Sequence, residues 1–403
     1  MRHLWFLTFV CGLYGVAIGV WSVATPQACL ALGLTSEQLG IVGAGAAVGY
    51  ALSCLLLGQL LRAVPGKYVL LGGVALALGA AFAMREAQGA GAAIAAQLTL
   101  GVASGAFWPF CSAWMLDFQA EGLSKTRILR HYNLAWTSGT MLGYLAGGWL
   151  CESGAVFGSF LVCAGIFGIS LLLALAPKAT ENPGHEVLPT KTRQAAEAAR
   201  TAARRVGWPL LVAAVLANLV ALASRAVVNV NYAELNETLG FGKERMGYLG
   251  AASLAGQMLA FACGRFYEPY LGLRRTYALM GLVLAGLCAG YAEATWLPAL
   301  LLLAALNGLV LAVAFQHGLF AAIGFFAAPR TGTTVHEAAV GLGTLTPALA
   351  GLLVQAAKES AWDAHAALRA PLWALALLAL AGLGIQLLLV SLRREDRLLL
   401  RAA

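Results

Sequence analysis

The sequence predicts an all-α polytopic membrane protein with twelve transmembrane helices in two six-helix pseudo-repeats. Sixty per cent of the 403 residues are hydrophobic, only 11% are charged, and the mean hydropathy is +0.78. A soluble chain of this length needs far more polar surface than that. The apolar residues also gather into runs long enough to cross a bilayer, and one polar turn recurs at matching places in the two halves.

Twelve runs approach the roughly 20 apolar residues that a transmembrane helix requires. The first run follows Arg2 and His3, as the core of a signal peptide would, but it is too long for one and has a counterpart that opens the second half. We therefore interpret it as a retained span. The predicted spans are 4–31, 38–61, 67–84, 91–116, 131–150, 155–176, 208–233, 246–263, 273–291, 297–327, 338–357 and 371–392.

Residues 177–207 form the one long polar connection and divide the chain into three predicted parts. These are an N-terminal six-helix bundle (1–176), a cytoplasmic central loop (177–207) with a short surface helix near 191–205, and a C-terminal six-helix bundle (208–403) with a short basic tail. If the N-terminus is cytoplasmic, 20 of the 26 Lys and Arg residues lie on that side, five lie outside, and Arg225 lies within a span. The positive-inside rule then places both termini in the cytoplasm and the protein in the cytoplasmic (inner) membrane.

An internal duplication relates the two halves. The turn Gly264–Arg275 reads GRFYEPYLGLRR, and a weaker copy, Gly58–Lys67, lies 206 residues earlier. Other segments match at nearly the same offset, and parallel six-span repeats of this kind bind solutes between the halves near the bilayer midplane. The further matches are Ser36–Gly40 with Lys243–Gly247 and Gly101 with Gly308 at an offset of 207, and Gly143–Gly148 with Thr346–Gly351 at 203.

The twelve spans, the basic central loop and the duplicated turn resemble the major facilitator superfamily over nearly the whole chain. The resemblance implies a gating role for residues in the two turns, for the acid that ends span 4, and for the glycines of span 5. Arg62 stands where the family has an acid, and Tyr144 replaces the proline of its span 5 motif. The implied gating residues are Gly58, Arg62, Asp117, Gly143, Gly147, Gly264, Glu268, Gly272, Arg274 and Arg275.

These features also have a purely structural interpretation. Small residues at every fourth position, as at Gly139, Gly143 and Gly147, let two helix backbones approach closely in lipid. The charges in the turns are able to form contacts in one conformation and break them in another. Alternatively, both features only hold the helices together.

Arg225 is the strongest candidate for a substrate-binding residue. A charge at the centre of a transmembrane helix costs about 2.5–3.5 kcal/mol on insertion scales and usually has a functional or pairing reason. At 100° per residue, Asn218, Arg225, Asn229 and Tyr232 share one face of their helix. The stripe predicts a cavity wall whose guanidinium binds an anionic group. The alternatives are an arginine that extends to the membrane surface or one that pairs with Glu234.

Other spans carry polar or aromatic side chains suited to a small-molecule site. His317 could carry a coupling proton, because its reference pKa lies near neutrality, or it could only bond a neighbouring helix. The resemblance implies that spans 1, 4, 7 and 10 surround the cavity. The additional substrate-binding candidates are Tyr14, Trp21, Trp108, Asn133, Trp136, Asn307 and His317.

The acids and the missing motifs narrow the function. None of the 18 Asp and Glu residues falls deep within a predicted span, which argues against an exporter of cationic drugs. We therefore expect a secondary active transporter that moves a small organic anion or polar metabolite across the cytoplasmic membrane by alternating access. A multidrug efflux antiporter, a neutral sugar or nucleoside transporter and a transporter-like sensor remain alternatives.

The sequence also predicts the partners of the protein. The sequence has no nucleophile–base pair, metal cluster or phosphate-binding loop, so we expect no enzymatic activity, cofactor or metal site. Its basic residues lie in short loops without interleaved aromatics, so we expect no nucleic acid. The expected partners are the lipid bilayer, a small-molecule substrate and, if transport is proton-coupled, a proton. The family resemblance implies a monomer.

Overall fold

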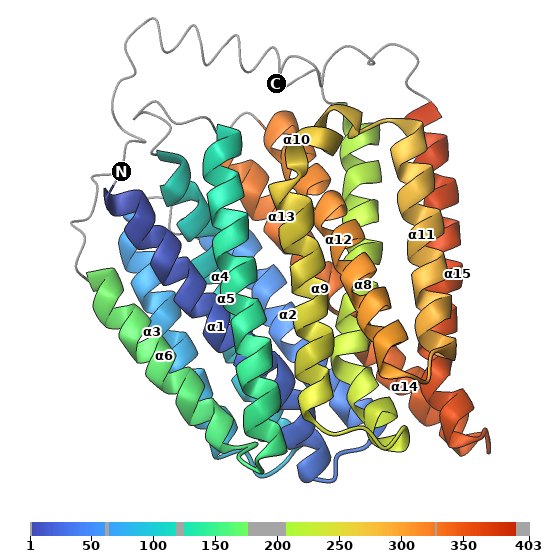
Figure 1. The fold of residues 1–403 in the computed structure, drawn as a ribbon. Helices are drawn as coiled ribbons and strands as arrows, with labels where there is room; N and C mark the ends of the chain where they lie inside the picture. The colour runs from blue at the N-terminus through green and yellow to red at the C-terminus, as the bar shows by residue number, and fades with distance from the viewer. Residues whose placement is uncertain (1, 61–63, 118–124, 176–206, 327–328, 392–403) are drawn as a thin grey trace, which may run out of the picture.

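A computed structural model describes residues 2–60, 64–117, 125–175, 207–326 and 329–391, and all of its regular structure is helical within these ranges. Long helices lie side by side in one bundle, with α1 starting and α15 ending at the same end (Figure 1). We call this the terminal end and the other the distal end. Large apolar side chains such as Leu172 and Trp149 are exposed on the sides of the bundle, as contact with lipid requires.

Six helices form the N-terminal half, and six spans form the C-terminal half. The N-terminal helices are α1 (Arg2–Ala31), α2 (Ser36–Leu60), α3 (Gly66–Arg85), α4 (Ala90–Asp117), α5 (Lys125–Glu152) and α6 (Gly158–Leu175). The C-terminal elements are α8 (Trp208–Thr238), α9 (Glu244–Ala262), the short α10 (Gly264–Tyr267), the 3₁₀ turn η3 (Glu268–Tyr270), α11 (Arg274–Glu293), α12 (Leu297–Phe325), α13 (Pro329–Gly343), α14 (Thr346–Glu359) and α15 (Ala364–Ser391).

The predicted spans recur in the structure with some changed bounds. Ten of the described helical segments are long and apolar enough to cross a membrane, and the bent pair α9 and α10, with a 63° break, is an eleventh. In this count α13 and α14 are one span, Thr331–Glu359. Its prediction as 338–357 was too short, because the Thr, His and Glu side chains of α13 lower its hydropathy. The predicted loop 177–207, with its surface helix, lies almost wholly outside the described residues.

Close backbone contacts within each half follow the duplication. Gly49 on α2 faces Gly101 on α4, where an added methyl group would lie 3.2 Å from the Cα of Gly101. At an offset of 207, Gly256 on α9 and Gly308 on α12 likewise press against the backbone of each other's helix. Helices in lipid associate through such packing, since burial from water contributes little there.

The span 5 glycines form a third contact, within the N-terminal half. Gly139, Gly143 and Gly147 lie against α1, where added methyl groups at the first two would collide with the carbonyl oxygens of Gly12 and Val16. The same spacing therefore fixes α5 on α1, which is the structural role that small residues at every fourth position suggested.

Two further glycine contacts join the halves at the distal end. Gly40 on α2 lies against Gly351 on α14, and Gly247 on α9 lies against Gly148 on α5. Each added methyl group would approach within about 3 Å of the partner's Cα. Gly40 and Gly247 are 207 residues apart, and Gly148 and Gly351 are 203 apart. The two interfaces between the halves are therefore related by the same duplication.

Gly139→Ala is expected to destabilise the protein by about 1–3 kcal/mol, because its methyl group has no room against the Gly12 carbonyl. Gly165→Ala in α6 is the matched control, since a methyl group there meets no atom within 4 Å and improves helix propensity. Unfolding of the two purified variants in detergent measures the difference. Equal stabilities would show that the α1–α5 contact relaxes without cost.

Candidate substrate-binding site

A cavity of about 330 Å³ lies between the two halves. Both halves supply its wall, through α1, α2, α4 and α5 on one side and α8, α9, α12, α13 and α14 on the other. The wall thus includes the expected spans 1, 4, 7 and 10, and spans 2, 5, 8 and 11 as well. Its charged members are Arg225 and Glu337, and its amide side chains are Gln97, Asn229 and Gln257.

Arg225 of α8 lines the cavity, and no hydrogen bond or ion pair joins its guanidinium to a described residue. The alternative pairing with Glu234 is not what the structure has, because Glu234 bonds Ser36 and Lys358 instead. Asn229, one turn along the same face, donates from Nδ2 to the hydroxyl of Tyr144 at 2.7 Å. The site therefore presents an unpaired cation beside a positioned amide.

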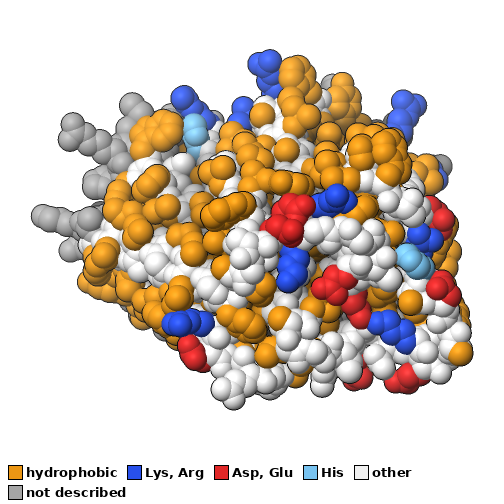
Figure 2. Space-filling model, turned by 60° about the horizontal axis from the view of Figure 1, so that its bottom comes forward, with side chains coloured by type: hydrophobic (Ala, Val, Ile, Leu, Met, Phe, Trp, Pro, Cys, Tyr) orange, Lys and Arg blue, Asp and Glu red, His pale blue; other side chains and the backbone are white. Residues whose placement is uncertain are grey.

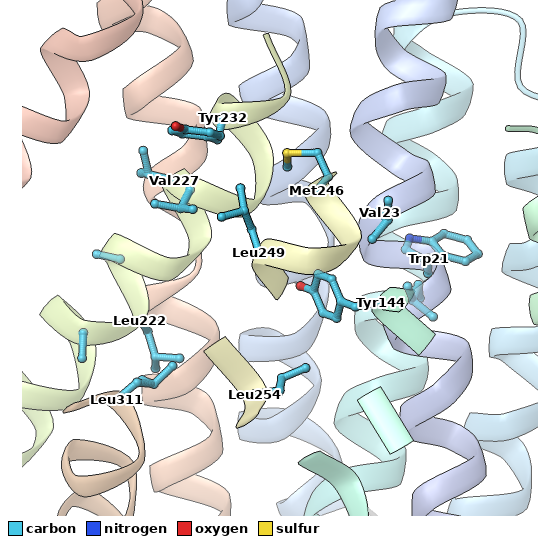
Figure 3. Packing of buried hydrophobic residues seen from close by; sticks show 14 of the residues in the cluster. Trp21, Val23, Tyr144, Leu222, Val227, Tyr232, Met246, Leu249, Leu254 and Leu311 are labelled. Atoms are coloured by element: carbon cyan, nitrogen blue, oxygen red, sulfur yellow. The ribbon is translucent and has the colours of Figure 1, made fainter. Parts of the chain in front are cut away.

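Tyr144, at the proline position of the family's glycine motif, is buried between the halves. In Figure 3 its ring lies beside Leu249 of α9, with Trp21 and Val23 of α1 on its other side. An added methyl group at Gly250 would overlap the Tyr144 ring. The tyrosine thus fills the space that Gly250 leaves and holds Asn229 from the opposite half. In the sequence, the replacement of the motif's proline by Tyr144 was the only sign that this residue has a special position.

Glu337 of α13 corrects the statement that no acid lies deep within a span. The residue is 5% exposed, lines the cavity, and accepts a hydrogen bond at 2.6 Å from the hydroxyl of Tyr50 in the other half. It was missed because the predicted span began at residue 338, whereas α13 begins at Pro329. The argument against cationic solutes that depended on this absence no longer holds.

Aromatic side chains form much of the rest of the wall. Trp21, Trp108 and Trp136, all predicted site residues, line the cavity together with Tyr132 and Phe315. The Trp108 ring lies 6.3 Å from Tyr132 and 6.4 Å from Trp136, in edge-to-face arrangements. The indole of Trp136 continues across to Phe315 of the other half at 6.0 Å.

Two predicted residues lie directly behind this wall. The hydroxyl of Tyr14 bonds at 3.1 Å to Ser104, which lines the cavity, and its ring stacks on Phe107. The side-chain oxygen of Asn133 accepts a hydrogen bond at 3.2 Å from the indole of Trp136. Both side chains therefore position cavity residues.

The remaining predicted site residues lie away from the cavity, in the packing of the C-terminal half. Asn218 is fully buried without a described hydrogen-bond partner, and Tyr232 packs against Tyr291. The stripe on α8 thus extends past the cavity at both ends, which helical angles alone do not reveal. Asn307 donates to Ser224 at 2.9 Å, and His317 bonds Tyr277 of α11 at 3.2 Å.

A group of charged and polar side chains joins the halves at the distal end, through Ser36. The ammonium of Lys358 on α14 lies 2.5 Å from the carboxylate of Glu234 on α8, and both groups bond the hydroxyl of Ser36 on α2 at 2.8 Å. Glu152 of α5 similarly accepts the backbone N–H of Lys243 at 2.7 Å. Figure 2, which brings this end forward, shows acidic and basic side chains lying beside one another.

The duplicated turn makes a contact between the halves at the terminal end. Glu268 accepts a hydrogen bond from Gln316 of α12 at 2.7 Å and lies 3.8 Å from the guanidinium of Arg130 on α5. Gln316 in turn accepts from Tyr267. The acid of the turn is thus shared by both halves.

The other implied gating residues have different positions. Gly264 is buried beside Glu268, and Gly272 has a φ of 81°, a left-handed conformation that favours glycine. Arg274 and Arg275 are exposed at the start of α11, and no ion pair joins them to a described acid. Gly58 is the third-last residue of α2; the side chain of Asp117 and all of Arg62 lie outside what the structure describes.

Comparison with known proteins identifies the family. The model of the Major Facilitator Superfamily matches residues 4–333. The chain belongs to this superfamily. Its relatives of known structure share the fold at low sequence identity, and no curated protein sequence matches the chain significantly.

Three solved structures illustrate the shared fold. The nucleoside transporter NupG is 13% identical, with a TM-score of 0.71 over 96% of this chain and 99% of that one. A bacterial homologue of the human lysosomal transporter Spinster, inward-facing and occupied, gives 12% identity and 0.73 over 98% and 97%. FucP, in an outward conformation, gives 14% identity and 0.64 over 98% and 99%. A superfamily chain of this fold is an integral membrane protein with the architecture of a transporter.

The Glu234–Lys358 contact is expected to contribute about 1 kcal/mol of coupling energy, because it is partly buried, short and shared with Ser36. A double-mutant cycle with Glu234→Gln and Lys358→Met, followed by equilibrium unfolding in mixed detergent, measures it. The more exposed pair Arg85–Glu86, at 3.5 Å, serves as the control and should give a value near zero. Equal coupling in both pairs would contradict a stabilising role for the distal contact.

Proposed function

We propose that the protein is a secondary active transporter that moves a small organic anion or polar metabolite across the cytoplasmic membrane by alternating access. The observation that carries the proposal is Arg225, an unpaired guanidinium in a cavity between two pseudo-symmetric halves. A charge within the membrane that has no protein partner is costly unless a ligand or water satisfies it. An anionic group on the solute supplies that partner through charge-assisted hydrogen bonds.

The contacts on either side of the cavity support alternation. The distal group of Ser36, Glu234 and Lys358 and the terminal-end pair of Arg130 and Glu268 both connect one half to the other. Separation of the halves at one end breaks the contacts there while those at the other end hold. Polar contacts of this kind exchange between two states more readily than a continuous apolar interface.

The proposed orientation follows from charge. With both termini cytoplasmic, the terminal end faces the cytoplasm and the distal end faces the outside, since this arrangement places most Lys and Arg residues inside. The Arg130–Glu268 contact is then the inner gate, and the group around Lys358 is the outer gate.

A neutral polar solute is the second candidate. The amides of Gln97, Asn229 and Gln257 and the aromatic rings of the wall suit a sugar or nucleoside, and one structural neighbour is a nucleoside transporter. A neutral solute, however, leaves the charge of Arg225 without a partner. A purely cationic solute is disfavoured more strongly, because it meets that charge directly.

Organic anions are expected to raise the thermal midpoint of the wild-type protein in detergent and to lose this effect in Arg225→Ala. A ligand that binds only the folded state stabilises it by RT ln(1 + [L]/Kd), about 2.7 kcal/mol at 100 times Kd. The screen compares organic anions with sugars, nucleosides, amino acids and cationic drugs. Arg225→Lys, which keeps the charge but not the planar fork, should retain part of the response.

Arg265→Ala is the matched control for this screen, since Arg265 is exposed in the terminal-end turn and stacks on Phe266 outside the cavity. It should respond as the wild type does. If neutral solutes or cations stabilise the wild type and Arg225→Ala equally, and anions stabilise neither, Arg225 is structural and the anion proposal is wrong.

A further inference from the structure

The cavity is lined by one guanidinium and one carboxyl group that do not pair with each other. Arg225 lies on α8 and Glu337 on α13, both in the C-terminal half, and both line the same space. No ion pair joins them among the described residues, where Glu337 accepts from Tyr50 and Arg225 has no hydrogen-bond partner. Because an unpaired charge inside the membrane is costly, the arrangement calls for a partner that supplies both opposite charges.

The surroundings of Glu337 suit an ammonium group. One carboxylate oxygen accepts from Tyr50, and the rings of Tyr50, Trp108, Tyr132 and Trp136 line the cavity on the N-terminal side. Tyr50 and Trp108 pack with Ala338, the residue after Glu337. An ammonium is attracted both by the carboxylate and by the faces of aromatic rings. This part of the wall therefore has the composition of an aromatic cage closed by an acid.

The surroundings of Arg225 suit a carboxylate. Asn229 follows it by one helical turn and is held by the Tyr144 hydroxyl at 2.7 Å. A guanidinium binds a carboxylate through two parallel hydrogen bonds, and a nearby amide adds a further polar contact. The apolar residues Leu222, Ala226 and Val230 of the same helix face the cavity beside these groups and leave room for hydrocarbon.

We propose that the transported solute is a zwitterion, an amino-alkanoate whose carboxylate binds Arg225 and whose ammonium binds Glu337 within the aromatic cage. The proposal depends on the proposed function and names its substrate class. A solute with only a negative charge is repelled by the carboxylate of Glu337. A solute with only a positive charge is repelled by the guanidinium of Arg225. A solute that carries both charges satisfies both walls of the cavity.

The bond between Glu337 and Tyr50 gives the ammonium a second effect. Tyr50 belongs to the N-terminal half and Glu337 to the C-terminal half, so their contact at 2.6 Å holds the halves together at the cavity. An ammonium on the carboxylate competes with the Tyr50 hydroxyl for it. Solute binding then weakens one contact between the halves at the point where the solute sits.

The test uses the full-length protein in detergent and three series of equal chain length. These are aminoalkanoates from 3-aminopropanoate to 8-aminooctanoate, the corresponding alkanoates and the corresponding alkylamines. We expect the wild type to bind the best aminoalkanoate at least tenfold more tightly than its alkanoate and its amine. In Glu337→Gln the preference over the alkanoate falls to about one while alkanoate binding is retained. In Arg225→Ala the preference over the amine falls to about one.

Glu359→Gln is the matched control, because this acid is exposed at the end of α14, bonds Gln355 and lies outside the cavity wall. It should keep the wild-type preference. The wild-type ratios decide the proposal even if Glu337→Gln does not fold. Tyr50→Phe gives a further test, since it keeps the carboxylate and removes its competitor, and should bind the aminoalkanoate at least as tightly as the wild type.

Three outcomes overturn the zwitterion proposal: equal binding of aminoalkanoate and alkanoate by the wild type, no binding of any aminoalkanoate, or an unchanged preference in folded Glu337→Gln. If Glu337→Gln keeps the preference but loses a pH dependence of binding that the wild type shows, Glu337 takes up a proton instead of binding the ammonium. If alkanoates still bind in an Arg225-dependent way, the proposed anion site stands although the zwitterion falls. If no probe depends on Arg225, both fail.

Discussion

The close approach of helix backbones at glycines is the constraint on which the rest of the structure depends. Lipid is as apolar as a leucine side chain, so helices in a bilayer gain little from hiding apolar surface and associate by packing and polar contacts. Gly49 against Gly101, and Gly256 against α12, fix equivalent helix pairs in the two halves. The bundles that result are rigid enough for a polar cavity to remain between them.

The cavity departs from the symmetry of that packing. At the offset of 207 residues that relates the glycines, Arg225 corresponds to Ile18, which also lines the cavity. Glu337, at the offset of 203, corresponds to Leu134. The packing residues are therefore shared by the two halves, whereas the charges occur in one half only. The half that carries the two charged residues of the cavity differs from the half that supplies most of the aromatic wall.

Much of the fold was predictable because it depends on patterns along the sequence. Lipid contact demands long apolar runs, and the duplication repeats Gly40 and Gly101 at a fixed offset, so spans and pseudo-repeats follow from the sequence alone. Arg225 and Asn229 were equally visible, since a charge in an apolar helix stands out. Glu337 was not visible as a buried acid. Polar residues of α13, which lines the cavity, lower the hydropathy of that helix, so the predicted span began after Glu337. Asn218 and Tyr232 share a helical angle with Arg225, but the ends of the cavity are set by the neighbouring helices.

The two distal interfaces have a consequence for how such a chain is built. Gly40 of α2 meets Gly351 of α14, and Gly247 of α9 meets Gly148 of α5, so each half presents one surface of each kind. A polypeptide of the N-terminal half alone carries both surfaces, at Gly40 and at Gly148. Two copies related by a two-fold axis would make both contacts with themselves, as isologous dimers do. The single chain thus has the packing geometry of a homodimer, but its cavity charges occur once, whereas a symmetric dimer would carry each of them twice.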